Sequence, residues 1–264
     1  MFAWLKERKR TKLRAQPFPQ FWADIIDPNV PYCAGLNEKD RQELQGHVQV
    51  LLAEKHFEGC AGFVITDEVK VTIAAHASFL LLHRDTGYFP RLRTILVYPT
   101  AFIVKNLEQG PGGTVSESDG VHLGESWGQG TVVLAWDEVE KSARHSADGY
   151  NVVLHEFAHQ LDQEDGVADG APILSQRDLY ERWAEVLSAE YDQLKRDLKR
   201  RRNTLIDPYG ATDAAEFFAV ATETFFETPD KMHRRHPDLY QALRDYYQQD
   251  PRQYIADSPT DWLS

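Results

Sequence analysis

Two histidines of this chain, His155 and His159, stand four residues apart, and Glu156 directly follows the first. In a helix this spacing is about one turn, so both imidazoles project from the same face. Two imidazoles on one face can bind one zinc ion, with Zn–N bonds of about 2.0–2.1 Å. Glu156 would lie about 100° further round the helix. From there its carboxylate suits a general base toward a water molecule at the metal.

The five residues form the H-E-x-x-H pattern that is typical of zinc metallopeptidases. In a chain with ten histidines and many acids, the pattern arises by chance in roughly a few per cent of cases. The flanking residues favour a helix, because Asn151 is a good N-cap residue and Gly166 a good C-cap residue. An apolar stripe at helical spacing supports the same prediction and consists of Leu154, Phe157, Ala158 and Leu161.

A catalytic zinc site needs a third protein ligand, and the segment from residue 209 to residue 226 offers the best candidate. Thr212 or Asp213 is expected to cap a helix in which Glu216 and Glu223 share one face, while most other positions are apolar. A glutamate in so apolar a helix is costly to bury unless it is paired or bound to a metal. We therefore predict a site with two histidines and Glu216, with Glu223 behind the ligands.

Alternative interpretations exist for three acids of this region. Glu216 can instead be a first-turn acid that is stabilised by the helix dipole. Asp162 lies three residues after His159, on the ligand face, where it can bond to a histidine or line the substrate cleft. It can also be an ordinary polar residue near a helix end. Glu223 can likewise be an ordinary structural residue.

The His155–His159 motif, the later helix with Glu216, and Tyr209 seven residues before that glutamate resemble the gluzincin metallopeptidases, which include the catalytic domain of anthrax lethal factor. The chain is more similar still to one bacterial family, the Mlc titration factor A or glucose-regulated metallopeptidases. The resemblance covers about residues 30–255. Besides the motif it rests on residues 36–39, 95–99, 124–130, 132–136, 209–216, 226 and 246–251.

The resemblance implies an α+β, zincin-like fold and one Zn²⁺ per chain, bound by His155, His159 and Glu216. It implies that Glu156 is the general base and that Tyr209 donates a hydrogen bond to the developing oxyanion. The alternative for Tyr209 is packing at the turn beside Pro208. Better-known gluzincins often carry an acid four residues after the ligand glutamate, where this chain has Val220. Either Glu223 or Asp162 replaces that acid, or fewer groups hold the ligands in place.

The resemblance also implies two functions. One is aminopeptidase-like hydrolysis of a peptide or protein substrate. The other is binding of the Mlc-type transcriptional repressor. This binding sequesters the repressor and so relieves repression of the sugar phosphotransferase system. The alternative is a protein that is primarily a repressor-binding anti-repressor, with weak or vestigial peptidase activity. The sequence leaves the natural substrate open, and endopeptidase activity remains an alternative to aminopeptidase activity.

Composition narrows the class of protein further. A net charge of −12 argues against a general nucleic-acid binder, because binding to phosphates requires clustered cations. The two cysteines, Cys33 and Cys60, cannot make a disulfide framework and are expected to be free thiols of a cytoplasmic protein. No stretch of 18 apolar residues is present, so no membrane span is expected.

We expect a basic leader at residues 1–16, disordered or loosely docked, or else lying on an anionic membrane surface. Residues 17–264 are expected to form a single zincin-like domain. Its N-terminal subdomain would span about 17–150, and its helical C-terminal subdomain about 151–264.

Hydrophobic periodicity predicts α+β structure with a small mixed or antiparallel sheet. Helices are predicted over residues 38–57, 69–82, 179–202 and 239–247, and strands over 63–65, 94–98 and 131–136. Residues 108–130 are rich in glycine and serine and are predicted to be a loop or a long hairpin. We expect the strand at 131–136 to be the edge strand along which an extended substrate lies.

Overall fold

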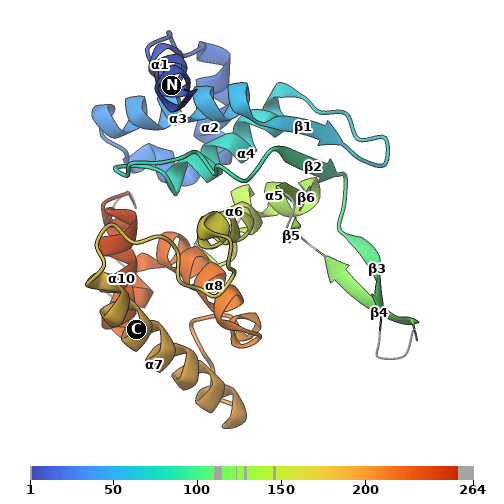
Figure 1. The fold of residues 1–264 in the computed structure, drawn as a ribbon, viewed down its shortest axis with the longest axis vertical. Helices are drawn as coiled ribbons and strands as arrows, with labels where there is room; N and C mark the ends of the chain where they lie inside the picture. Colours follow the sequence, from blue (N-terminus) through green and yellow to red (C-terminus); the bar gives the residue numbers. More distant parts are fainter. Residues whose placement is uncertain (1, 110–114, 123, 128–129, 145–146, 255–264) are drawn as a thin grey trace, which may run out of the picture.

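A computed structural model of the chain describes residues 2–109, 115–122, 124–127, 130–144 and 147–254. Helices make up most of the molecule, and a small sheet lies at one side of them (Figure 1). This arrangement agrees with the predicted α+β class. One connected cluster of buried apolar side chains extends from Ile26 to Tyr254 and joins the helices to the sheet.

The N-terminal helices pack on one another, with α1 on α3, α3 on α4 and α2 on α4, and two of them begin at side-chain caps. Asn37 caps α3 by accepting a hydrogen bond from the backbone N–H of Asp40, and Thr66 caps α4 through the N–H of Val69. Helix α4 is buried over almost its whole length, as its apolar, alanine-rich sequence predicts. The elements are α1 (Phe2–Arg14), α2 (Gln20–Asn29), η1 (Pro31–Gly35), α3 (Glu38–Glu54) and α4 (Asp67–Phe79).

The main sheet has four strands in the order β1-β2-β6-β5. Strands β1, β2 and β6 are parallel, with Ile95 of β2 opposite Val132 of β6, and β5 runs antiparallel to β6. The prediction of a small mixed sheet is therefore confirmed. The strands are β1 (His56–Gly59), β2 (Thr94–Tyr98), β5 (Gly124–Trp127) and β6 (Thr131–Ala135).

The prediction of a strand at residues 63–65 is wrong, because the first strand, β1, begins seven residues earlier, at His56. The chain turns directly after β1, where Ala61 and Gly62 both adopt positive φ angles. The chain passes so close to β1 after this turn that a side chain at Gly59 would collide with the carbonyl oxygen of Phe63. Residues 63–65 therefore pack against the end of β1 and do not form a strand of the sheet. Strand β1 is half exposed at the sheet edge, and its sequence is correspondingly polar.

Strand β6 is not the edge strand that we predicted, because it lies between β2 and β5. Its last four residues are all buried, and an unbroken apolar run is typical of an interior strand. The edge nearest the histidine helix is instead β5. The segment predicted as a loop or long hairpin, residues 108–130, overlaps an antiparallel hairpin that begins earlier, at residue 102. The hairpin consists of β3 (Phe102–Gln109) and β4 (Val115–His122) and projects from the body (Figure 1).

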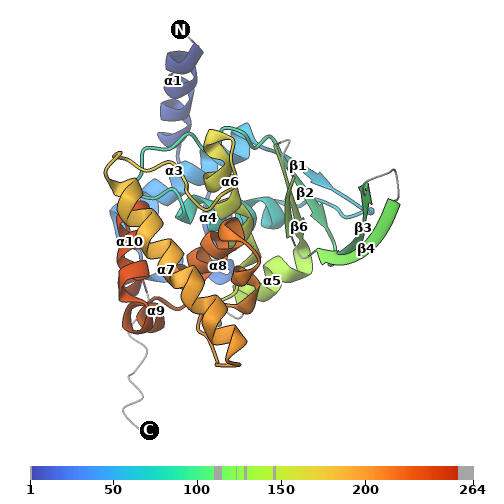
Figure 2. The ribbon, with the colours of Figure 1, turned by 60° about the horizontal axis from the view of Figure 1, so that its bottom comes forward.

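The C-terminal half is helical, and its helices α7, α8, α9 and α10 pack side by side, to the left of the sheet in Figure 2. Helix α6 lies between the two halves, since it contacts α4, β5 and β6 on one side and α8 on the other. No helix of the described residues is long and apolar enough to cross a membrane. The elements are α5 (Trp136–Arg144), α6 (Val152–Asp162), η2 (Gln163–Asp165), α7 (Leu179–Lys199), η3 (Pro208–Ala211), α8 (Ala214–Glu227), α9 (Pro229–Arg235), α10 (Pro237–Tyr247) and η4 (Pro251–Gln253).

The segment predicted as a disordered or loosely docked leader, residues 1–16, contains helix α1, which packs on α3. Arg10 is only 6% exposed and makes two hydrogen bonds of 2.8 Å to the carboxylate of Glu54. It also donates to the carbonyl of Gly87 and lies 4.5 Å from the ring centroid of Tyr88. One charge of this basic segment, that of Arg10, is thus buried and paired with Glu54.

Replacing Arg10 with alanine should lower the free energy of unfolding by about 2 kcal/mol, because it leaves Glu54 without its bidentate partner. Lys12 is exposed on the same helix, and Lys12→Ala should change stability by less than about 0.5 kcal/mol. Urea unfolding of both variants measures the difference. Equal stabilities would contradict the docking of α1 on α3.

Candidate metal centre

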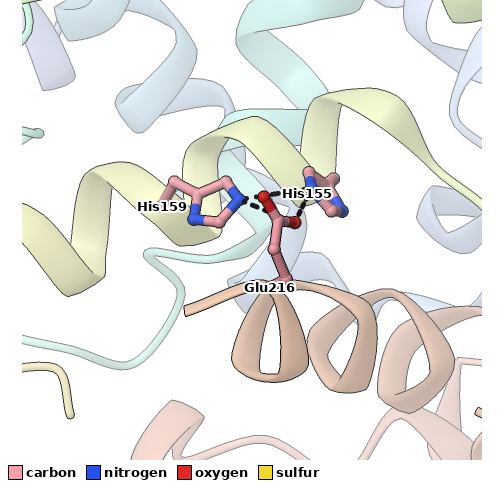
Figure 3. A group of neighbouring side chains, drawn as sticks. All are labelled: His155, His159 and Glu216. Carbon is pink, nitrogen blue, oxygen red and sulfur yellow. Dashed lines mark hydrogen bonds and ion pairs between the residues drawn. The ribbon is translucent and has the colours of Figure 1, made fainter. Parts of the chain in front are cut away.

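Three predicted ligands, His155, His159 and Glu216, meet where α6 faces α8 (Figure 3). Glu216 Oε2 lies 3.1 Å from His155 Nε2 and 3.4 Å from His159 Nε2. The two Nε2 atoms are 3.2 Å apart. One ligand atom from each residue therefore points to a common position.

These separations fit a bound metal ion. Ligand atoms at the corners of a tetrahedron with bonds of 2.0–2.1 Å are about 3.3 Å apart. Glu216 Oε2 is buried and has no hydrogen-bond partner among the described residues, although both imidazoles are near it. A carboxylate oxygen without a hydrogen bond, facing two imidazole nitrogens, is the arrangement that a metal ion would complete.

Helix α6 positions both histidines. Asn151 caps the helix by accepting a hydrogen bond of 3.0 Å from the N–H of Leu154, as predicted. Leu154, Phe157 and Leu161 are buried on the apolar face. Because that face is fixed in the core, His155 and His159 are directed toward α8.

Helix α8 positions Glu216 in its first turn. Of the two predicted caps, Asp213 is the one used, and its carboxylate accepts a hydrogen bond of 2.9 Å from the N–H of Glu216. The rest of the helix is almost entirely buried. The alternative of an ordinary first-turn acid does not account for the two imidazoles beside the Glu216 carboxylate.

Glu223 contacts His155 at Nδ1, whereas Glu216 lies at Nε2 of the same ring. Its Oε1 accepts a hydrogen bond of 2.7 Å from His155 Nδ1–H, and its Oε2 accepts one of 2.6 Å from the backbone N–H of Asn151. A carboxylate can only accept, so His155 Nδ1 carries a proton, and in the neutral imidazole that binds a metal the lone pair of Nε2 faces Glu216. Val220 stands where related peptidases often have an acid that orients a histidine, and the geometry favours Glu223 over Asp162 as its replacement.

Asp162 does not lie against either histidine in the described part of the chain. Its Oδ2 accepts a hydrogen bond of 3.0 Å from the N–H of Gly170, and its Oδ1 is buried without a partner. Burial raises the pKa of Asp162 to about 6. The geometry places this residue at the base of the loop after α6, where its hydrogen bond goes to Gly170 and His159 acts on it only through its charge.

A second buried carboxylate, Glu227, extends the contact between the two helices and was not predicted. Glu227 Oε1 accepts hydrogen bonds from the hydroxyl of Tyr32 and from Asn151 Nδ2, and its Oε2 accepts one from the N–H of Ala147. Burial raises the pKa of Glu227 to about 7. The signal in the sequence is its position four residues after Glu223 on an apolar helix, but the partners come from distant segments.

Glu156 is 3% exposed, and its Oε2 has no hydrogen-bond partner among the described residues. Burial raises the pKa of Glu156 to about 7, against the effect of the two neighbouring histidines, which lower it. A buried carboxylate beside two candidate ligands, with one free oxygen, can accept a proton from a molecule bound there.

Tyr209, in the short helix η3, lies beside two of the three ligands, Glu216 and His155. Its hydroxyl is 3.4 Å from Glu216 Oε1, its ring centroid is 6.1 Å from that of His155, and the residue is 56% exposed. Burial and the carboxylate of Glu216 raise the pKa of Tyr209 to about 12, so the phenol is neutral and can donate. A side chain this exposed does not have the packing role considered as its alternative.

The electrostatics of the site favour binding of a cation. Burial acts to lower the pKa of His155, but Glu223 and Glu216 raise it well above its usual value. Burial acts to raise the pKa of Glu216, but the two imidazoles hold it well below its usual value. Three carboxylates, those of Glu156, Glu216 and Glu223, thus surround two imidazoles, and a divalent cation would offset their charge.

Comparison with known proteins assigns the chain to a family. The model of the family described as glucose-regulated metallo-peptidase M90 matches residues 4–248. An uncharacterized protein of Synechocystis sp. is 45% identical over 249 residues, which cover 94% of this chain and 90% of the relative.

Two further relatives carry a name. Mlc titration factor A of Pectobacterium atrosepticum is 34% identical and covers 88% of this chain and 87% of its own length. Mlc titration factor A of Yersinia pestis is 32% identical over a segment that covers 95% of this chain and 91% of the relative. A metallopeptidase family implies a metal ion, and His155, His159 and Glu216 are a group that can hold one. This chain belongs to the glucose-regulated metallo-peptidase M90 family.

Proposed function

We propose that this protein is a zinc-dependent peptidase with a zincin-like fold. The observation that carries the proposal is the convergence of His155 Nε2, His159 Nε2 and Glu216 Oε2 within 3.1–3.4 Å of one another. Two imidazoles and one carboxylate are the ligands of many catalytic zinc sites, which keep a fourth position open. A zinc ion held there would polarise the scissile carbonyl and acidify a water molecule.

The roles of the other residues follow from their positions. Glu156 takes a proton from the attacking water, since its buried carboxylate has one oxygen free. It then returns that proton to the leaving amine. Tyr209 donates a hydrogen bond to the oxyanion of the tetrahedral intermediate, because its exposed phenol lies beside two of the ligands. Glu223 holds His155 in the tautomer that presents Nε2.

The substrate would bind along β5 in an extended conformation. This strand is the antiparallel edge of the sheet, and it contacts α6. An edge strand presents unpaired backbone groups that a peptide can pair with. We propose aminopeptidase-like activity on small peptides, with endopeptidase activity on a protein as the alternative. Cys33 and Cys60 are both free, which supports a reducing, cytoplasmic setting.

A second proposed function is binding of an Mlc-type repressor, and this rests on the relatives named Mlc titration factor A. Hydrolysis and binding are compatible, because binding requires a surface and hydrolysis requires the metal site. In the alternative form of this proposal, repressor binding is the main function and peptidase activity is vestigial.

Glu156→Gln should lower kcat for aminoacyl anilides by about 10³-fold, because glutamine keeps the shape of the side chain but cannot accept the proton. Zinc content, measured by mass spectrometry, should equal that of the wild type. Glu185→Gln on the exposed face of α7 is the matched control and should retain full activity. A Glu156→Gln protein as active as the wild type would exclude this residue as the general base.

Tyr209→Phe should lower kcat by about 10²-fold with unchanged zinc content, because it removes one donor to the oxyanion. Tyr191→Phe is the control, since the Tyr191 hydroxyl donates to the carbonyl of Ala211 in the same short helix and does not face the ligands. Full activity of Tyr209→Phe on peptides with free and with blocked amino termini would rule out the oxyanion role.

The repressor proposal is tested by capture of a purified Mlc-type repressor on the immobilised protein. The wild type and Glu156→Gln should bind it with the same affinity, because that substitution leaves the surface unchanged. Binding by neither form would remove the proposal, and binding by the wild type alone would tie it to catalysis.

A further inference from the structure

A second group of ligand-type side chains lies outside the site described above. Asp40 and Glu43 are on α3, and His83 lies in the segment that joins α4 to β2. One ligand atom of each lies within 4.8 Å of the other two. Asp40 Oδ1 is 2.8 Å from His83 Nε2, and Glu43 Oε1 accepts a hydrogen bond of 2.7 Å from the backbone N–H of His83.

A buried imidazole is aimed into this group. His47 lies one turn after Glu43, and its side chain is 6% exposed. Its Nε2 is 3.4 Å from Glu43 Oε1, yet it makes no hydrogen bond among the described residues. Its other nitrogen, Nδ1, is 2.8 Å from the hydroxyl of Tyr88. A buried polar atom without a well-formed hydrogen bond is unfavourable, and Nε2 has only this long ion-pair contact with Glu43, which a shared metal ion would replace.

The outer contacts of His83 set which of its nitrogens is free. Its Nδ1 is 3.0 Å from the backbone carbonyl of Gln248, which can only accept a hydrogen bond. Nδ1 therefore carries the proton, and Nε2 faces Asp40. Asp40 is held in turn by Asn37, whose Nδ2 donates to Asp40 Oδ2 at 2.8 Å. Metal-binding histidines typically donate their second ring N–H to a carbonyl, and ligand carboxylates are typically hydrogen-bonded in the same way.

The charge of the group also favours a cation. With a neutral His83, the carboxylates of Asp40 and Glu43 carry a formal charge of about −2, which a divalent ion would offset. Without a metal, a proton takes that place. Burial acts to lower the pKa of His83, but its bonds to Asp40 and Gln248 raise it. The neighbouring His47 lowers the pKa of Glu43, so this carboxylate is ionised and able to bind a metal.

We propose that Asp40, Glu43 and His83, with His47 as a fourth group, form a second binding site for a divalent transition-metal ion. Mixed imidazole and carboxylate ligands suit ions such as Zn²⁺ and Mn²⁺. The site shares no residue with His155, His159 and Glu216. A metal there joins α3 to the segment before β2 and, through Gln248, to the end of α10. Its role is to stabilise the packing of the N-terminal helices on the C-terminal half.

The test is the stoichiometry of Zn²⁺ binding to metal-free protein, by calorimetry and by mass spectrometry of the dialysed complex. The wild type should bind about two equivalents. The Asp40→Asn, His83→Gln double variant should bind one, and so should the His159→Gln, Glu216→Gln double variant. The protein with all four substitutions should bind almost none. One equivalent in the wild type, or two in the Asp40→Asn, His83→Gln variant, would overturn the proposal.

Two measurements keep the test independent of folding defects. Glu43→Gln preserves the acceptor for the His83 N–H but removes the charge, and it should weaken the second equivalent at least about 10-fold. In the His159→Gln, Glu216→Gln protein, saturating Zn²⁺ should raise the melting temperature by about 5 °C. That rise should vanish when Asp40→Asn and His83→Gln are added. Unchanged binding in Glu43→Gln, or a rise that persists, would contradict the site.

Discussion

The candidate metal centre depends on one buried carboxylate, that of Glu223, which joins the two ligand helices. It accepts from His155 Nδ1–H with one oxygen and from the Asn151 N–H with the other. The first bond sets the tautomer of a candidate ligand, and the second holds the residue that caps α6. Because Glu216 is on the same helix as Glu223, α8 both supplies the third ligand and orients the first. A shift of α8 along α6 would disturb both contacts together.

Burying this carboxylate is unfavourable unless each of its oxygens is paired. Burial raises the pKa of Glu223, while His155 and the Asn151 N–H act to lower it. Glu227, one turn later, repeats the arrangement with Tyr32, Asn151 and Ala147. The start of α6 is therefore held by two acids of α8, and these polar contacts lie inside an apolar interface. Such fully paired networks favour one helix register over others, since any slip leaves charges unpaired.

Sequence reasoning found what depends on spacing within one helix. The four-residue separation of His155 and His159 and the apolar surroundings of Glu216 predicted residues that the structure brings together. Where the choice depended on packing between distant segments, the sequence left alternatives, as with Glu223 and Asp162, or gave a wrong prediction, as with the edge strand. The docked leader depends on Arg10 meeting Glu54, and the second cluster depends on His83, which has a positive φ in an irregular segment. Neither contact has a periodic signal in the sequence.

The most direct test of the central claim is a crystal structure of the zinc-loaded protein, with anomalous data collected at the zinc edge. We predict a zinc ion bound by His155 Nε2, His159 Nε2 and a carboxylate oxygen of Glu216, with solvent in the remaining position and Glu223 still bonded to His155 Nδ1. A zinc ion absent from these three residues, or one closed off by a fourth protein ligand such as Glu156, would contradict the account.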